Sequence, residues 1–278
     1  MTRDAMRSQP PTPPPGAEIL QAGGRGGTGN LLYVFRNETP PLLLKVYRCR
    51  RSLLRESLKN FSERVMEGKR GATAAIRYAT EKLNLDLWAR EGFDVVQRVE
   101  RPLSAGIAPP ALWITYYDAP HLGEVLADSS RTIEARLALC NQLGAALSRR
   151  HTRAVELKEP LLIHEHGNVK HFLVAGNRLI AFDLEHGYKP GFPVIEAIAR
   201  EISGVAQSMA RSDASNAGRL LSSFAAGYAN KELLGQAIHL AVNGGGLSGR
   251  IRRWRERGRD LTHGKTRIMQ QLGGLIGA

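Results

Sequence analysis

Residues 161–185 constrain the fold of this chain more than any other segment, because apolar and polar stretches alternate there in a fixed order. A short apolar run, 161–163, is expected to form a strand, and a polar loop follows it. A second apolar run, 172–174, a Gly-Asn turn and a third run, 178–182, predict a β-hairpin. The hairpin delivers Asp183 at its far end. The loop contains three histidines: His164, His166 and His171.

The length and the net charge of the chain limit the classes of protein to which it can belong. With 278 residues, of which 42% are hydrophobic and 23% charged, the chain can form one large domain or two modest lobes. Lys and Arg number 39 against 26 Asp and Glu, which gives a formal net charge of +13. This excess favours anionic partners such as phosphates, acidic lipid headgroups or nucleic acid, although many basic proteins are simply soluble.

The two cysteines, Cys49 and Cys140, are far apart and form no Cys-x-x-Cys pair, which fits a reducing compartment. No run of about 18 apolar residues is present, so no membrane-spanning helix is expected. The N-terminal stretch has no apolar core and is Pro-rich at 10–15, which is not the pattern of a secretory signal. We therefore expect a cytoplasmic protein, with peripheral contact to the inner face of the membrane as a further option.

The first 35 residues are expected to hold a flexible arm and a glycine-rich hairpin. Residues 1–16 are Pro-rich and predicted to be disordered. A strand, 31–35, follows a formal G-x-G-x-x-G, whereas a dinucleotide-binding unit needs a helix there. A strand–turn–strand arrangement suits a lid whose backbone N–H groups approach phosphate oxygens, and a mobile linker is the alternative. The glycines of this motif are Gly24, Gly26 and Gly29.

Lys45 stands in the apolar run 42–47, which is expected to form a third strand. Burying an ammonium group costs free energy unless the group meets an anion, so we expect a phosphate or a carboxylate beside it. An edge strand that turns the lysine to water is the alternative. The carboxylate candidate is Glu81, in a helix expected to stop at Gly92. Its competitors are Glu63, Glu67 and Glu91.

Apolar periodicity predicts the remaining elements. Residues 50–90 are helical in pattern with a break near 68–71, and the part at 75–88 is expected to present an apolar face. The last stretch, 250–259, carries six arginines around Trp254. Further strands are expected at 95–99 and 111–117, and further helices at 133–150, 194–209, 217–229 and 232–242.

Asp183 and the loop histidines are the candidates for chemistry. Hard Mg²⁺ prefers oxygen ligands, so a carboxylate at the end of a buried strand suits it, with a turn or a helix cap as the alternative role. The imidazole of His166 can accept a proton near neutral pH. The imidazole of His171 binds Mg²⁺ poorly and softer divalent ions well. A transition-metal cluster of His164, His166 and His171 is therefore an alternative interpretation.

Taken in order, the glycine turn, Lys45, Glu81, a hinge strand and the histidine loop resemble the protein-kinase-like superfamily over residues 18–230. The compact build looks most like the bacterial lipopolysaccharide core (Kdo/heptose) kinases and their relatives. No Ala-Pro-Glu motif follows Asp183, which argues against a conventional protein kinase with a regulated activation loop. The resemblance implies an α+β, bilobal fold with a small β-rich lobe and a larger helical lobe.

The histidine loop departs from the family at two positions. The family's loop reads His-x-Asp-x-x-x-x-Asn, and in this chain the Asp is replaced by His166 and the Asn by His171. His164 occupies the position of the family's structural histidine. An alternative register takes 166–168 as a variant His-Gly-Asp, but it leaves the loop two residues short. The resemblance implies four segments: an arm at 1–16, the small lobe at 17–118, the large lobe at 119–245 and a basic helical extension at 246–278.

The resemblance assigns nucleotide-binding roles to the first lobe. Lys45 would hold the α- and β-phosphates of ATP beneath the glycine turn, and Glu81 would orient Lys45. The hinge, 113–118, would bind adenine through main-chain groups at Tyr116 and Tyr117. Because these contacts use the backbone, side-chain identity carries no trace of them.

The resemblance assigns metal and acceptor roles to the second lobe. Asp183 would be the primary ligand of Mg²⁺ or Mn²⁺, with Glu185 assisting and His171 at the position of the metal-binding Asn. His166 would position the acceptor hydroxyl. Lys170 would contact the transferred phosphoryl group or face solvent.

Two functions from different classes follow. The first is an ATP-dependent phosphotransferase acting on a lipopolysaccharide sugar or another small anionic hydroxyl acceptor. The second is a catalytically impaired pseudokinase that serves as a nucleotide-binding or regulatory module. The arginines at 250–259 suggest peripheral contact with an acidic membrane surface or, less favoured, with nucleic acid, and a solvated helix is the alternative.

Overall fold

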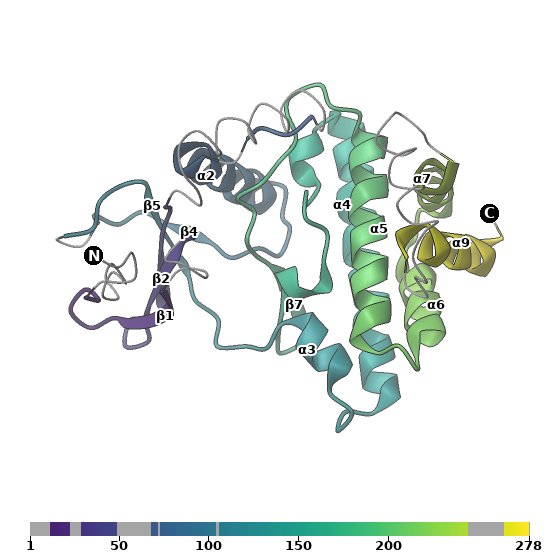
Figure 1. The fold of residues 1–278 in the computed structure, drawn as a ribbon, viewed down its shortest axis with the longest axis horizontal. Coiled ribbons are helices and arrows are strands. Elements are labelled where there is room, and N and C mark those ends of the chain that lie inside the picture. Colours follow the sequence, from purple (N-terminus) through teal and green to yellow (C-terminus); the bar gives the residue numbers. More distant parts are fainter. Residues whose placement is uncertain are drawn as a thin grey trace, which may run out of the picture. The chain divides into compact units, whose positions relative to one another are not determined.

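The computed structural model describes residues 12–22, 29–48, 68–71, 73–103, 106–243 and 264–277. The chain divides into two compact units, Met1–Asp118 and Ala119–Ala278. The smaller unit holds an antiparallel sheet and a helix, whereas the larger unit is mainly helical (Figure 1). This arrangement confirms the predicted α+β, bilobal class. The first eleven residues of the predicted arm and all of the arginine-rich stretch 250–259 lie outside the described residues, so their predicted roles stay predictions.

The sheet of the smaller unit is antiparallel throughout, with the strand order β1-β2-β3-β5-β4. Its third strand is buried at every position, which explains why its sequence is apolar at every position except Lys45 rather than alternating. A core of aromatic and aliphatic side chains, including Phe35 and Trp113, packs on one face. The strands are β1 (Glu18–Ala22), β2 (Leu31–Phe35), β3 (Leu42–Val46), β4 (Arg98–Val99) and β5 (Ala111–Thr115).

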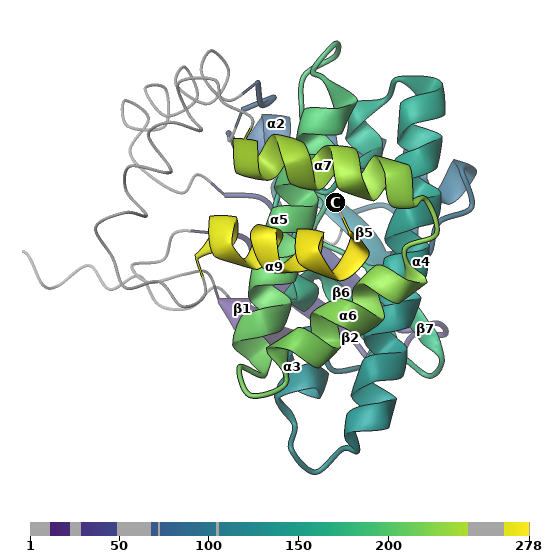
Figure 2. The ribbon, with the colours of Figure 1, turned by 90° about the vertical axis from the view of Figure 1, so that its right-hand side faces the viewer.

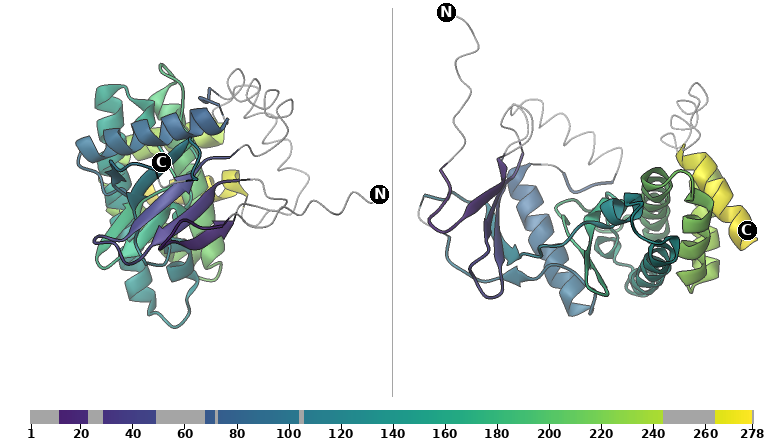
Figure 3. Two further views of the ribbon diagram at one scale, coloured as in Figure 1. Left: turned by 90° about the vertical axis from the view of Figure 1, so that its left-hand side faces the viewer. Right: turned by 90° about the horizontal axis from the view of Figure 1, so that it is seen from below.

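The helix α2 (Ala74–Arg90) runs beside this sheet (Figure 3, right). It begins where the Thr73 side chain accepts a hydrogen bond from the N–H of Ile76, and it ends just before Gly92, which has a positive φ of +74°. The predicted apolar face is wrong in part. The helix exposes Leu83 and buries polar side chains instead: Arg77, Thr80, Glu81 and Asn84.

The predicted strand at 95–99 is shorter than expected, because only Arg98–Val99 pair with β5. Before this pair, the N–H of Gln97 donates to the hydroxyl of Thr115 (2.9 Å) rather than to a ladder carbonyl. A side-chain acceptor takes the place of a backbone acceptor, which ends the regular ladder there. The apolar residues Val95 and Val96 are nevertheless buried in the core.

The larger unit confirms the predicted helices. The two long helices α4 and α5 lie side by side, and the shorter C-terminal helices form a layer against them (Figure 2). α4 extends beyond the predicted end at residue 150, until Lys158 adopts the left-handed conformation with φ 53°. No helix in the described ranges is long and apolar enough to cross a membrane. The helices are α3 (Leu122–Ala127), α4 (Ile133–Leu157), α5 (Val194–Ser212), α6 (Ala217–Gly227), α7 (Lys231–Asn243) and α9 (Lys265–Ile276).

The central hairpin is confirmed as β6 (Phe172–Ala175) and β7 (Arg178–Ala181), joined by a turn in which Gly176 has a positive φ of +61°. The strand expected at 161–163 is wrong. Pro160–Leu162 form a 3₁₀ turn, because a proline is suited to the first helical position and the Glu159 side chain accepts from the N–H of Leu161 (3.0 Å). A second 3₁₀ turn, Val169–His171, leads into β6.

Glycines allow two pairs of backbone segments in the larger unit to approach closely. A Cβ added at Gly144 of α4 would overlap the carbonyl oxygen of Phe224 on α6, and one added at Gly227 of α6 would overlap the carbonyl of Asn141 on α4. A Cβ on Gly204 of α5 would likewise overlap the carbonyl of Gly167 in the histidine loop. These contacts hold α4 to α6 and the loop to α5 at backbone distance.

Replacing Gly144 by alanine should therefore destabilise the larger unit by about 1–3 kcal/mol or more, because the helices must separate to admit the methyl group. Equilibrium urea unfolding measures this change. The matched control is Gly274→Ala on α9, where an added Cβ meets nothing within 4 Å. That control should be neutral or gain up to about 1 kcal/mol from better helix propensity. Equal effects of the two substitutions would contradict the close approach.

Candidate functional site

Lys45 lies on β3, which pairs with β2 on one side and β5 on the other. The edge-strand alternative is therefore wrong. The Lys45 side chain is 6% exposed, and its Nζ lies 2.7 Å from Oε2 of Glu81, whose side chain is 1% exposed. The competitor Glu91 instead meets Arg90 at 3.4 Å on the surface. The other competitors, Glu63 and Glu67, lie outside the described residues.

The Glu81 carboxylate has a second partner inside the same unit. The hydroxyl of Tyr47 donates to Glu81 Oε2 at 2.5 Å, and the Lys45 ammonium lies 5.4 Å from the centre of the Tyr47 ring. The Arg77 guanidinium approaches the same ring at 5.8 Å and donates to the Asn30 side-chain oxygen at 2.6 Å. Two cations and one carboxylate therefore surround a tyrosine next to β3, which explains why α2 turns polar side chains inward.

The structure describes only one of the three glycines of the predicted glycine turn. Gly24 and Gly26 lie outside the described residues, whereas Gly29 is described and has a φ of +116°, a conformation that L side chains rarely adopt. β1 and β2 pair in antiparallel fashion on the two sides of this segment, so the predicted hairpin is confirmed. Phosphate binding by the glycines stays a prediction.

The hinge candidates follow β5. The N–H of Tyr116 donates to the carbonyl of Pro41 (2.8 Å), so this donor is already engaged within the sheet. The Tyr116 hydroxyl contacts Arg36 and Asp118, each at 3.2 Å, and burial raises the pKa of this phenol. An adenine would therefore need main-chain groups other than the Tyr116 N–H, and Tyr117 stays a candidate by position.

His164 anchors the loop of the larger unit. Its ring is buried, its Nε2–H donates to the carbonyl of Phe182 (3.2 Å), and its Nδ1 accepts from the N–H of His166 (3.2 Å). The carbonyl can only accept, so Nε2 carries the proton. Burial lowers the pKa of His164 and keeps the ring neutral. The ring thus ties the loop to the end of β7.

Glu201 on α5 has a buried carboxylate that binds the start of the same loop. It accepts from the guanidinium of Arg150, from Nε2 of His151 at 3.0 Å and from the N–H of His164 at 3.1 Å. Burial by itself raises the pKa of Glu201, but Arg150 and then His151 outweigh it and lower the pKa to about 2. Sequence analysis missed this network, because charged residues on an amphipathic helix carry no sign of being buried.

His171 is buried between the loop and Asp183. Its ring stacks on His164, with centroids 4.7 Å apart, and its Nδ1–H donates to the carbonyl of His166 at 2.8 Å. Burial, reinforced by the neighbouring His164 ring, lowers the pKa of His171 to about 3. The ring is therefore neutral, and its Nε2 lone pair lies 3.9 Å from Oδ2 of Asp183.

Asp183 follows β7 in the left-handed conformation, with φ 62°, which aspartate tolerates better than most residues and which is common at functional sites. Its side chain is 39% exposed, whereas that of Glu185 is 1% exposed. The two carboxylates offer oxygens within 4.8 Å of each other. Carboxylate oxygens are the ligands that Mg²⁺ and Mn²⁺ prefer, and the neutral His171 ring lies next to Asp183.

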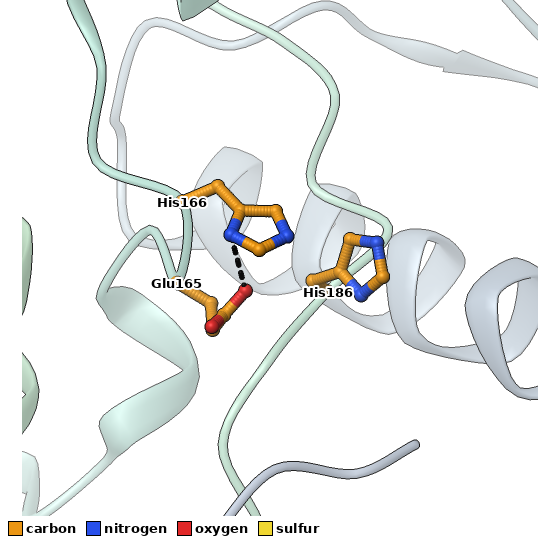
Figure 4. A group of neighbouring side chains, drawn as sticks. All are labelled: Glu165, His166 and His186. Carbon is orange, nitrogen blue, oxygen red and sulfur yellow. Dashed lines mark ion pairs between the residues drawn. The ribbon is translucent and has the colours of Figure 1, made fainter. Parts of the chain in front are cut away.

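His166 is the most exposed of the loop histidines, with a side chain 51% exposed. Its Nδ1 lies 2.8 Å from Oε2 of Glu165, a carboxylate that is only 4% exposed (Figure 4). The two groups therefore lie at ion-pair distance, with the charge on the imidazole present only when the ring is protonated. Glu165 was missed by sequence analysis, although its position next to His166 was visible.

A cavity of about 450 Å³ lies within the larger unit, next to the histidine loop. The backbone segment 167–170 forms one wall, with α3 and α5 opposite. Its lining includes the cations Lys170, Arg211 and Lys265 and one carboxylate, Glu124. That carboxylate is occupied in capping α3 together with His121. The cavity is therefore electropositive and open to an anionic molecule.

Comparisons with known proteins show no family for this chain. No family model matches it, and no curated protein matches its sequence. Among solved structures, the kinase domain of a maize sucrose-induced receptor kinase bound to AMP-PNP is 14% identical, with a TM-score of 0.37 over 94% of this chain and 91% of that chain. A MAP kinase from Leishmania major is also 14% identical, with a TM-score of 0.41 over 94% of this chain and 79% of that chain.

The kinase-like character of the fold rests on elements within the chain itself. A lysine on the third strand pairs with a glutamate on the following described helix, in the manner of the kinase β3-lysine and αC-glutamate. A helical unit follows, with a hairpin that ends in an aspartate. The fold is therefore kinase-like, with a small antiparallel β-rich part and a larger helical part.

The Glu201 network makes stability depend on pH. Glutamine mimics a protonated carboxyl group, so Glu201→Gln should lower the free energy of unfolding by on the order of 3 kcal/mol near pH 7. The folded-state pKa of about 2 lies below the usual value of 4.5, so the stabilisation is complete above about pH 5 and is lost as the pH falls towards 2. The difference in the free energy of unfolding between wild type and variant should therefore become smaller as the pH is lowered.

Urea unfolding of both proteins at about pH 7, 5 and 3.5 measures that difference. Buried neutral histidines weaken both proteins below about pH 6.5, and the loss of Glu201 lowers the pKa of His151 and His164 further in the variant, so the narrowing is read between about pH 5 and 3.5. Glu196→Gln is the matched control on the same helix: Glu196 is half-exposed and pairs with Arg200 one turn away, so it should change stability by less than about 0.5 kcal/mol. If the free energies of unfolding of wild type and Glu201→Gln differ by the same amount at every pH, Glu201 is not ionised in the folded protein.

Proposed function

We propose that this chain is an ATP-dependent phosphotransferase that phosphorylates a hydroxyl of an anionic sugar, such as those of lipopolysaccharide cores, or of another small anionic molecule. The buried Lys45–Glu81 pair carries the proposal. In kinases such a pair places the lysine on the nucleotide phosphates. A buried ion pair is often no more stabilising than apolar residues of the same volume, so a binding role explains its presence better than stability does.

The donors at the end of β7 support a metal-assisted reaction. Asp183, Glu185 and the Nε2 lone pair of His171 would hold the cation. A divalent ion at this place would neutralise charge on the β- and γ-phosphates during transfer. The left-handed backbone at Asp183 directs the chain from β7 into the segment that carries Glu185, which places both carboxylates at one end of the hairpin.

The Glu165–His166 pair supports a proton acceptor in place of the missing aspartate. With Nδ1 placed 2.8 Å from Glu165, Nε2 would be the nitrogen that accepts the proton of the acceptor hydroxyl. The hydroxyl oxygen then bonds to the γ-phosphorus, the bond from that phosphorus to the β-phosphate oxygen breaks, and ADP leaves. Glu165 would stabilise the imidazolium formed on His166, as the carboxylate does in a Ser-His-Asp triad.

The electropositive cavity beside the loop supports an anionic acceptor. Lys170 and Arg211 are exposed on its lining and Lys265 is partly buried, so phosphate or carboxylate groups of an acceptor would meet three cations there. Backbone atoms of Gly167 and Asn168 line the same cavity, directly after His166 in the chain. This position suits an acceptor whose hydroxyl is presented to His166.

One observation favours a second function, a nucleotide-binding module without turnover. The residue at the position of the family's metal-binding asparagine is His171, whose Nδ1 is committed to a backbone carbonyl and whose remaining donor is a nitrogen. Nitrogen is a poor ligand for Mg²⁺, which would weaken metal-assisted transfer. Turnover therefore separates the two functions, whereas nucleotide binding is common to both.

Mg²⁺-ATP should stabilise the wild-type chain against heat and fail to stabilise Lys45→Met, because the variant loses the ammonium that holds the phosphates. At a hundredfold excess over Kd the wild type should gain about 2.7 kcal/mol, a Tm shift of several degrees. Differential scanning fluorimetry, with and without nucleotide for each variant, measures the shift independently of any change in basal stability.

Lys82→Met is the matched control, since Lys82 lies exposed on α2 next to Glu81 in sequence and should keep the full shift. If Lys45→Met responds to nucleotide like the wild type, Lys45 does not hold the phosphates. If the wild type itself shows no shift with Mg²⁺-ATP or Mn²⁺-ATP, the phosphotransferase and the nucleotide-binding module are both refuted.

His166→Ala should lower kcat by about 10²- to 10⁴-fold, the usual contribution of a general base, while the nucleotide-induced Tm shift is retained. Glu165→Gln should have a smaller effect in the same direction. ADP release, measured with anionic and neutral sugar acceptors, reports the change. His239→Ala on α7 is the control, because His239 is exposed and remote in sequence from the loop. Unchanged turnover in His166→Ala would overturn this role, and nucleotide binding without turnover in the wild type would select the second function.

A further inference from the structure

The side chains of Glu165, His166 and His186 converge on one point of the larger unit (Figure 4). Each offers one oxygen or nitrogen atom, and these atoms all lie within 4.8 Å of one another. Two of the side chains are well shielded: that of Glu165 is 4% exposed and that of His186 is 11% exposed. His166 is half-exposed and therefore lies on the solvent side of the group. The rings of the two histidines contact edge to face, with centroids 4.6 Å apart.

The backbone that carries these side chains is held in place on both sides. The N–H of His164 donates to Glu201, and Gly167 packs against the backbone of Glu201 and Gly204 on α5, so the two residues between are fixed at both ends. His186 follows the buried residues Leu184 and Glu185 after β7. The group is therefore built from two segments about twenty residues apart that only the folded loop brings together.

The spacing of the donors is close to that of a bound ion. Ligands that share a Zn²⁺ ion at about 2.1 Å in tetrahedral geometry lie about 3.4 Å from one another. The His166 Nδ1 and Glu165 Oε2 atoms lie 2.8 Å apart, and one nitrogen of His186 lies within 4.8 Å of the donor atoms of the other two residues. Two imidazole nitrogens and one carboxylate oxygen suit Zn²⁺, Mn²⁺, Co²⁺ or Fe²⁺ rather than Mg²⁺.

A second carboxylate supports the orientation of His186. Oε1 of Glu185 lies 3.5 Å from Nε2 of His186. In metal sites a carboxylate on one imidazole nitrogen orients the ring and leaves the other nitrogen to bind the ion. Glu185 would thus act as a partner of the His186 ring beside the ion, and one of the two ring nitrogens would bind it.

We propose that Glu165, His166 and His186 form a binding site for a transition-metal dication of the Zn²⁺ type, separate from the Mg²⁺-type site expected at Asp183. Three protein ligands leave a fourth position for water or for an anionic ligand. This site also differs from the cluster of His164, His166 and His171 considered from the sequence. There, Nδ1 and Nε2 of His164 and Nδ1 of His171 are committed to hydrogen bonds.

One consequence rests on the proposed function, whereas the metal site itself does not. An ion on Nδ1 of His166 displaces the proton from that nitrogen to Nε2, which then donates a hydrogen bond and can no longer accept the proton of an acceptor hydroxyl. Occupancy of the site would therefore inhibit phosphotransfer without preventing nucleotide binding.

The test uses the full chain, freed of metal with a chelator and titrated with Zn²⁺ and, separately, with Co²⁺ in the absence of nucleotide. Isothermal titration calorimetry should give one Zn²⁺ per chain, and Co²⁺ should develop the visible absorption of a low-coordinate N/O site. His186→Ala should weaken Zn²⁺ binding by at least 10- to 100-fold, the range seen for loss of even an outer-sphere partner. Glu165→Gln should act in the same direction.

His239→Ala, an exposed histidine on α7, should leave the affinity unchanged. Far-UV circular dichroism checks that each variant is folded. The proposal is overturned if the wild type binds no Zn²⁺, or if His186→Ala and Glu165→Gln, folded, bind it as the wild type does. Zn²⁺ binding without loss of phosphotransfer would overturn the inhibitory consequence alone, and failure of the nucleotide tests would leave the metal site standing.

Discussion

The buried carboxylate of Glu201 is the interaction on which the larger unit depends, because three parts of the chain meet at its two oxygens. Arg150 and His151 belong to α4, the carboxylate itself to α5, and the His164 N–H to the histidine loop. A carboxylate with no water around it is costly unless every oxygen is satisfied. The requirement to satisfy it therefore sets the distance between the two long helices and fixes where the loop starts.

The histidine loop is held in place by its contacts with Glu201 and with the backbone of α5. His164 is held through its N–H, Gly167 lies against the backbone of α5, and His171 stacks on His164. The buried rings of His164 and His171 stay neutral, since burial lowers the pKa of both. The exposed His166 therefore belongs to a loop whose other two histidine rings are buried and neutral, and its Nδ1 lies 2.8 Å from the shielded carboxylate of Glu165.

Imidazoles rather than carboxylates dominate the loop at 164–171, and this choice decides its chemistry. An aspartate brings negative charge beside a metal, whereas a histidine brings a proton acceptor and an affinity for softer ions. Glu165 restores a carboxylate one position away from His166, and His186 adds a nitrogen from the segment after the hairpin. The loop therefore combines the donors of a general base with those of a transition-metal site.

The sequence by itself determined the elements whose signal is local. The continuous apolar run of β3, the hairpin β6–β7 and the helices α5, α6 and α7 follow from patterns a few residues long, and those predictions are confirmed. The resemblance to the kinase-like superfamily also singled out Lys45 and Glu81, two side chains that the fold pairs at 2.7 Å. Local patterns fail where a side chain's environment is set by distant residues, as with the strand expected at 161–163 and the apolar face expected on α2.

Only the tertiary structure decided which charged residues are buried and what they face. Arg77, Glu165 and Glu201 look like solvated charges in the sequence, because a buried ion pair and an exposed one use the same residue types. The partners of Arg77 and Glu201 lie tens of residues away in the chain, and no period of 2 or 3.6 residues relates them. The anchor beneath the loop and the meeting of Glu165, His166 and His186 therefore exist only once the helices and the hairpin have packed.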